Sequence, residues 1–232
     1  QASQSSFNPV KQIKTQFLDA VRAHDRSQST NDILQRARAL IELVMLDADV
    51  VLDAFPHELS GGMKQRALIA LSLVLNPRLI ILDEPTTALD LITQAKILEL
   101  LNRLKKQFGF SLLFITHDLG IVSELSDRVV TMYAGRVVED SPTRDFFETP
   151  RHPYSRGLIN AIPRLVMDSS NIYSIPGSPP HMIDIKIGCP FAPRCPHRLN
   201  QCDLEMPPLT NVEAENRSYA CWNPVTEWER ND

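Results

Sequence analysis

The sequence lacks several features that would assign it to a common class of protein. Its longest apolar runs, such as Leu79 to Leu82, are far shorter than the roughly 20 residues that span a bilayer. No segment has the pattern of a signal peptide. A net charge of -4 and a pI near 5.9 provide no broad basic surface, so nucleic acid is a poor default partner. We therefore expect any association with a membrane to go through a partner protein.

Two further absences concern specific sites. None of the eight glycines belongs to a Gly-x-x-x-x-Gly-Lys-Ser/Thr loop, the backbone cradle that holds the β- and γ-phosphates of a nucleotide. The four cysteines contain no Cys-x-x-Cys pair, the spacing of many structural zinc sites. The sequence thus has neither a phosphate loop nor a standard zinc-binding pair.

What the chain does have is enough apolar sequence for a globular core. Its 232 residues are 43% hydrophobic, which suits one large domain or a medium domain with an appendage. Residues 10 to 55 carry apolar residues at helical spacing, as in Ile13, Phe17 and Val21. A second helical stripe follows Thr30, a candidate helix cap.

Residues 60 to 140 alternate helix and strand. The apolar runs at 79–83 and 110–116 stand between helical segments at 62–75, 94–106 and 119–125, and two strands at 128–133 and 136–139 turn at Ala134-Gly135. Buried strands between helices predict an α/β fold, a mostly parallel sheet covered on both faces. The final hairpin is expected at the edge of that sheet.

Two strings in this region carry chemistry. Ser60, Gly61 and Gly62 precede a helical segment, where free backbone N–H groups and the helix dipole favour a phosphate; an ordinary helix cap is the plain alternative. The strand at 79–82 delivers Asp83 and Glu84 to its carboxyl end, where one carboxylate can hold Mg²⁺ and the other can orient a water. Together they indicate nucleotide hydrolysis.

These strings resemble motifs of the ATP-binding-cassette ATPases. Leu59-Ser60-Gly61-Gly62-Met63-Lys64-Gln65-Arg66 is similar to the signature motif, and Leu79-Ile80-Ile81-Leu82-Asp83-Glu84-Pro85 to Walker B. Ala88-Leu89-Asp90 resembles the D-loop, Ile115-Thr116-His117-Asp118 the switch histidine, and the stretch from Gln1 to Pro9 the Q-loop. The family more often has glutamine where Met63 stands, which affects only the side-chain contact at that position.

The resemblance implies a role for each residue. Asp83 would hold Mg²⁺ through a water, Glu84 would polarise the attacking water, and His117 would contact the γ-phosphate and hold Glu84 in register. Ser60, Gly61 and Gly62 would close on ATP held by the P-loop of an opposite subunit, with Asp90 and the Q-loop Gln1 also at the nucleotide. Since the chain begins part-way through such a domain, we expect it to lack the first strands and the P-loop, and to be inactive alone.

After Pro150 the composition changes, because twelve of the seventeen prolines lie at or beyond that position. Arg151-His152-Pro153-Tyr154 and Ile175-Pro176-Gly177-Ser178-Pro179-Pro180 resemble the C-terminal extension of dipeptide and oligopeptide importer ATPases. We expect three parts: a Q-loop and helical subdomain at 1–56, an ATPase core at 57–150, and the extension at 151–232.

The extension holds all four cysteines, Cys189, Cys195, Cys202 and Cys221. An ATPase implies a reducing compartment, where clustered cysteines more often bind metal than form disulfides. Four thiolates suit Zn²⁺ or a 4Fe–4S cluster, and free thiols remain a third alternative. Resemblance of Gly188-Cys189-Pro190-Phe191 and Pro193-Arg194-Cys195-Pro196 to the importer extension favours the iron–sulfur cluster, with His197 outside the ligand set.

The expected function is that of the ATP-hydrolysing subunit of a peptide importer, peripheral at the cytoplasmic face of the membrane. ATP and Mg²⁺ are the implied cofactors. The implied partners are a homologous ATPase subunit and membrane permeases that dock on the helical subdomain. Three alternatives remain: a cassette ATPase for another solute or for export, a chromosome-maintenance ATPase of the same head fold, and a metal-binding interaction module. Chromosome-maintenance ATPases split the head with a long coiled coil, and no sustained heptads occur here.

Overall fold

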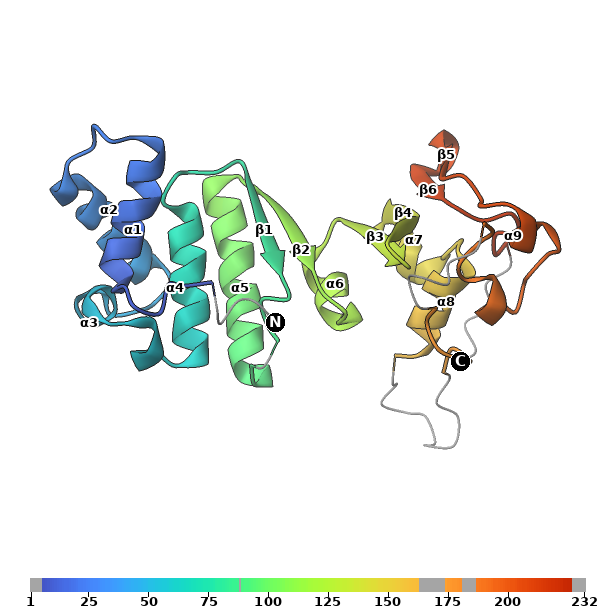
Figure 1. Cartoon of the computed structure of the whole chain (residues 1–232), viewed down its shortest axis with the longest axis horizontal. Helices are drawn as coiled ribbons and strands as arrows, with labels where there is room; N and C mark the ends of the chain where they lie inside the picture. Colours follow the sequence, from blue (N-terminus) through green and yellow to red (C-terminus); the bar gives the residue numbers. More distant parts are fainter. Residues whose placement is uncertain (1–5, 88, 163–173, 181–186, 227–232) are drawn as a thin grey trace. The chain divides into compact units, whose positions relative to one another are not determined.

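The computed structural model describes residues 6–87, 89–162, 174–180 and 187–226 (Figure 1). The chain divides into two compact units, residues 1–117 (unit 1) and 118–232 (unit 2).

Unit 1 combines a helical cluster with a short parallel sheet. Its elements are α1 (Ile13–His24), α2 (Thr30–Leu43), α3 (Ala48–Asp53), the 3-10 turn η2 (Pro56–Glu58), α4 (Gly61–Leu73), β1 (Leu79–Asp83), α5 (Leu91–Phe108) and β2 (Ser111–Ile115).

The predicted helical stripes form the core of this unit. Ile13, Phe17 and Val21 of α1 are completely buried, and one hydrophobic cluster joins them to apolar side chains of α2, α4, α5 and β1. The cap of α2 differs from the expectation, because Ser29 rather than Thr30 accepts the first-turn N–H, from Asp32. Serine and threonine are both favoured N-cap residues, with serine the better of the two, so the residue type agrees with the cap that the structure shows.

β1 and β2 pair in parallel, with Leu79 opposite Ser111 and Asp83 opposite Ile115. Both strands therefore end at the same edge. Alternation directs Leu82 and Phe114 toward the core shared with the helices, whereas Ile81 and Ile115 are 59% and 47% exposed. Among the described residues helices cover only one face, so the expectation of a sheet covered on both faces is not met here.

Unit 2 consists of shorter elements. They are α6 (Leu119–Leu125), β3 (Arg128–Tyr133), β4 (Arg136–Pro142), α7 (Thr143–Glu148), α8 (Pro153–Asn160), the 3-10 turn η5 (Ala192–Arg194), α9 (Gln201–Leu204), β5 (Thr210–Val212), the 3-10 turn η6 (Glu213–Glu215) and β6 (Arg217–Tyr219).

The strands of unit 2 form an antiparallel sheet in the order β3-β4-β6-β5. The hairpin of β3 and β4 was predicted, but its placement at the edge of the parallel sheet was wrong, since it belongs to this separate sheet, where β3 is an edge strand and β6 pairs with the other side of β4. The strands β5 and β6 have three residues each, too few to show an alternating pattern in sequence.

Candidate functional site

Glu84 follows directly after β1 and has a left-handed backbone, with φ of 45°. Such a conformation is unusual for a residue with a side chain, and residues held in it cluster at active sites and in tight turns. It is held by a hydrogen bond from the Glu84 N–H to the carbonyl oxygen of Ile115, at 2.9 Å. The parallel pairing of β1 and β2 thus fixes where the Glu84 side chain begins.

Two side chains hold the Glu84 carboxylate. His117 Nδ1 lies 3.2 Å from Oε1, and Thr87 Oγ1 donates to Oε2 at 3.1 Å. The hydrogen bond to His117 is the largest reason why the pKa of Glu84 lies below its usual value, followed by that to Thr87. Glu84 is therefore an ionised acceptor with a fixed orientation, the arrangement needed to align a water for attack.

Asp83 ends β1 and lies opposite Ile115. The structure places it next to Glu84, exposed at the carboxyl edge of the sheet. A hard cation such as Mg²⁺ prefers oxygen ligands and retains several waters, so one exposed carboxylate fits the role of an outer or water-mediated ligand.

The signature string begins α4. Ser60 is the helix cap, and its Oγ accepts the N–H of Met63 at 3.3 Å. Gly61 and Gly62 form the first turn, where backbone N–H groups have no partner within the helix. The expected helix start is thus confirmed, and its positive end could accept a phosphate.

Asp90 caps α5. Its carboxylate accepts both the N–H of Thr93 at 2.9 Å and the Thr93 hydroxyl at 2.7 Å. Thr93 also lies against Gly62, where an added Cβ would come within 2.8 Å of Thr93 Cγ2. The starts of α4 and α5 are therefore in contact, which agrees with their neighbouring positions in Figure 1.

Sequence reasoning missed Thr87 and Thr93. Each stands three residues after an assigned carboxylate, Glu84 and Asp90, at the spacing of a turn or helix cap. This spacing was the signal in the sequence that could have identified the two threonines. Gln1 and Ala88 lie outside the described residues, so the structure does not place the proposed Q-loop glutamine.

The four cysteines are free thiols, and all four line one small pocket in unit 2, together with His152 and His197. Burial is the largest factor that raises the pKa of Cys189, Cys195 and Cys221, the last to about 12. Gly188 lies so close to Cys202 that a Cβ there would come within 2.3 Å of the Cys202 carbonyl oxygen, and the Cys189 N–H donates to that oxygen at 2.7 Å.

The cysteine pocket does not form a closed metal site. Within the described part of the chain, no group of three or more His, Cys, Asp or Glu side chains is arranged to hold a metal ion. The donor chemistry nevertheless suits thiophilic metals, since four thiols, that of Cys202 buried and the other three partly buried, line one pocket.

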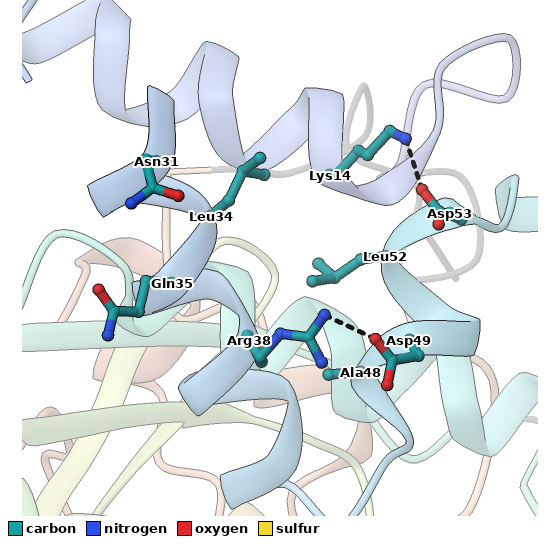
Figure 2. Close-up of a pocket in the computed structure, with 9 residues that line it drawn as sticks. All are labelled: Lys14, Asn31, Leu34, Gln35, Arg38, Ala48, Asp49, Leu52 and Asp53. Atoms are coloured by element: carbon teal, nitrogen blue, oxygen red, sulfur yellow. Dashed lines mark hydrogen bonds and ion pairs between the residues drawn. The ribbon is translucent and has the colours of Figure 1, made fainter. Parts of the chain in front are cut away.

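A second pocket, of about 500 Å³, opens in the helical cluster of unit 1. Figure 2 shows Leu34 and Leu52 lining it, with Lys14 paired to Asp53 and Arg38 paired to Asp49 at 2.6 Å. The pocket therefore combines a few apolar side chains with polar and charged ones.

Residues 2–87 match the family described as ABC transporter, the family whose motifs surround Glu84. The chain belongs to the ABC transporter family. Residues 138–202 match a second family, the C-terminal region of oligopeptide/dipeptide transporters. This second match covers most of the extension and three of its four cysteines.

Relatives of this ABC chain carry consistent descriptions. It is 43% identical over 223 residues to the oligopeptide transport ATP-binding protein OppD of Salmonella typhimurium strain LT2, covering 96% of this chain and 66% of that protein. It is also 43% identical over 215 residues to the dipeptide transport ATP-binding protein DppD of Caldanaerobacter subterraneus subsp. tengcongensis, covering 93% and 66%. The chain thus spans just under two thirds of the length of these curated relatives.

A solved structure supports the ABC ATPase fold. The dimeric, post-hydrolysis structure of the ATP-binding cassette MJ0796 bound to ADP and Pi matches with a TM-score of 0.53 at 28% identity, over 61% of this chain and 60% of that one. The described helices of the present chain include none that is long and apolar enough to cross a membrane.

Proposed function

We propose that this chain is part of the ATP-hydrolysing subunit of an importer of dipeptides or oligopeptides. The observation that carries the proposal is the Glu84 carboxylate held between His117 and Thr87 at the carboxyl edge of a parallel sheet. The OppD and DppD relatives support a peptide as the transported solute. A peripheral location at the cytoplasmic face of the membrane is part of the same proposal.

In this proposal Glu84 orients and polarises the attacking water, and His117 holds the carboxylate in register and contacts the γ-phosphate. Asp83 holds Mg²⁺ through a water, and the ion would neutralise charge that develops on the phosphates. Ser60, Gly61 and Gly62 act on the nucleotide of an opposite subunit, with Asp90 beside them. Gln1 is proposed as the Q-loop glutamine, and the three sequence-based parts 1–56, 57–150 and 151–232 as functional divisions.

The test uses this chain joined behind a P-loop segment of the same family, because the chain itself contains no such loop. Glu84→Gln should lower Mg²⁺-dependent turnover at least tenfold and leave ATP binding intact. Glu99→Gln, an exposed glutamate of α5, is the matched control and should retain full turnover. Equal turnover of the Glu84→Gln and unsubstituted proteins would refute the assignment.

We further propose that the pocket of the helical cluster receives a short segment of a permease subunit. Its mixture of apolar side chains, such as Leu34 and Leu52, with paired charges suits an amphipathic helix. Gln35→Trp would fill the pocket, whereas Ala39→Trp places the same side chain on an exposed part of α2 outside it. Only Gln35→Trp should prevent co-purification with the permease; retained assembly would place the partner elsewhere.

The four cysteines are proposed to hold one metal centre, a 4Fe–4S cluster, with Zn²⁺ as the alternative. Their shared pocket supports this, and metal ligation would favour the thiolates over the neutral thiols that burial favours in the metal-free chain. The centre would stabilise a proline-rich segment whose described elements after α8 have only three or four residues each.

Anaerobic purification should give about four irons per chain, and Cys202→Ser should reduce that content while His197→Asn leaves it unchanged. Stoichiometric zinc without iron would replace the cofactor but keep the site. Four thiols that react freely with an alkylating reagent in native, anaerobic protein, with neither metal present, would eliminate the site.

A further inference from the structure

The signature motif and the D-loop meet at one side chain. Gly62 in the first turn of α4 packs against Thr93 in the first turn of α5, and a Cβ on residue 62 would lie 2.8 Å from Thr93 Cγ2. Non-bonded carbon atoms are favourably separated by about 3.5–4.0 Å. The two helix starts can therefore approach this closely only because residue 62 lacks a side chain.

The hydroxyl of the same threonine faces the other motif. Thr93 Oγ1 donates to Asp90 Oδ2 at 2.7 Å, and the Thr93 N–H donates to Asp90 Oδ1 at 2.9 Å. Because Cγ2 and Oγ1 share one χ1 torsion, a rotation that moves the methyl away from residue 62 also moves the hydroxyl away from Asp90. Space at Gly62 and the orientation of Asp90 are thus linked mechanically.

We propose that Thr93 is a positioning residue that fixes the D-loop Asp90 relative to the signature motif, so that both meet the partner subunit's nucleotide as one rigid surface. The part about the partner rests on the proposed function, whereas the contact of Gly62, Thr93 and Asp90 does not. On this proposal, the lack of a side chain at Gly62 is needed for the orientation of Asp90, in addition to any need for space at a bound phosphate.

The first test needs no nucleotide and uses the whole 232-residue chain. Hydrogen bonds from Thr93 are the largest reason why the pKa of Asp90 is lowered, so an NMR titration of the Asp90 carboxyl reports the contact. Gly62→Ala should raise this pKa toward about 3.9, the ordinary value. Gly62→Ala combined with Thr93→Ser should lower it again, because serine keeps the hydroxyl and removes the clashing methyl.

Two single variants keep this test decisive if Gly62→Ala folds poorly. Thr93→Val preserves the shape but removes the hydroxyl, and should also raise the pKa of Asp90. Thr93→Ser alone should leave it unchanged. An Asp90 pKa that is the same in Thr93→Val as in the unsubstituted chain, or that stays raised in the double variant, would overturn the proposal.

The second test measures ATP-dependent dimerisation of the chain joined behind a P-loop segment. Gly62→Ala should weaken the dimerisation constant at least tenfold. Adding Thr93→Ser to this variant should restore the constant to within about threefold of that of the unsubstituted protein, which corresponds to a difference in dimerisation free energy of about 0.65 kcal/mol. If Thr93→Ser restores the pKa of Asp90 but not dimerisation, residue 62 must be small for the phosphate and the coupling role is wrong. If the unsubstituted protein never dimerises with ATP, the proposed function fails, and the titration still decides the contact.

Discussion

The two units are stabilised in different ways. Unit 1 has one large hydrophobic core that joins its helices to the sheet, and the ion pairs among its described residues, such as Arg38 with Asp49, are solvent-accessible. Unit 2 packs around smaller clusters, one on Phe146 and one on Phe191, and buries charged residues between its elements. We infer that periodic apolar sequence organises the first unit, whereas specific polar contacts organise much of the second.

The buried charges of unit 2 centre on Glu139 and Arg217, which are 0% and 6% exposed. Glu139 accepts the backbone N–H groups of Arg151 and His152 at 2.8 and 2.9 Å, and so anchors the start of α8. Arg217 donates to the Thr149 carbonyl oxygen at 2.8 Å. Each group thus joins strands of the sheet to the segment before α8.

The largest effect should come from the hydrophobic cores. Phe17 in unit 1 and Phe146 in unit 2 are both completely buried, so the same Phe→Ala change compares the two units. Phe17→Ala should cost about 3 to 5 kcal/mol of unfolding free energy. The loss for Phe146→Ala should lie near the lower end of this range, because a small cluster can collapse around the cavity that the substitution leaves. Hydrogen exchange of α1 and α7 measures the two losses.

A larger loss of unfolding free energy for Phe146→Ala than for Phe17→Ala would contradict this comparison. It would mean that the small cluster contributes more to stability than the extended core.

The second prediction compares two arginines. Arg217 lies within 3.1 Å of Glu215 and 3.6 Å of Asp145. Arg217→Met would remove the positive charge beside these two carboxylates and the hydrogen-bond donor to the Thr149 carbonyl oxygen. We expect a loss of about 2 kcal/mol, below the range for fully buried pairs because both carboxylates are about one-third exposed. Arg38→Met removes an exposed pair and should leave the urea midpoint unchanged. Equal midpoint shifts for the two variants would contradict the comparison.

The third and smallest effect concerns pH. Burial raises the pKa of Glu139, and hydrogen bonds to its carboxylate oppose this only in part. A carboxyl group whose pKa is higher in the folded than in the unfolded chain stabilises the fold fully at pH values below the unfolded pKa, and this stabilisation is lost as the pH rises through the folded pKa. The unfolding free energy of unit 2 should therefore fall over that interval.

Glu139→Gln should remove this part of the pH dependence, because the amide does not titrate. Asp145→Asn serves as the control, since Asp145 is a carboxylate of the same network with about one-third of its side chain exposed. If the pH dependence of Glu139→Gln matched that of the unsubstituted chain, other groups would be responsible.

The same difference between units explains what the sequence could predict. The strand at 79–83, the helix that starts after Ser60 and the hairpin from Arg128 follow from apolar periodicity and local capping, and the structure confirms them. The close pairing of Glu84 and His117 was expected only from the resemblance, because the two residues come from different strands. The roles of the site residues remain predictions.

Other features depend on contacts that no local pattern contains. Glu139 occurs in a strand beside the bulged pairing of Thr131 and Met132, which leaves the adjacent Val138 and Glu139 both buried. A glutamate next to a valine in sequence ordinarily indicates a solvent-facing position. Its partners on the segment before α8 become visible only in three dimensions, as does the contact of Thr93 with Gly62.

The most direct measurement mixes two inactive variants of the chain joined behind a P-loop segment. Gly61→Asp places a carboxylate where the proposed function puts the partner's phosphates, and Glu84→Gln removes the group proposed to orient water. In a symmetric dimer with sites shared between subunits, the mixed dimer has one intact site, and neither homodimer has any. The account predicts that mixing restores about a quarter of the unsubstituted ATPase activity, since about half of randomly assorted dimers are mixed. No activity above that of the separate variants would contradict a signature motif that acts on the partner's nucleotide.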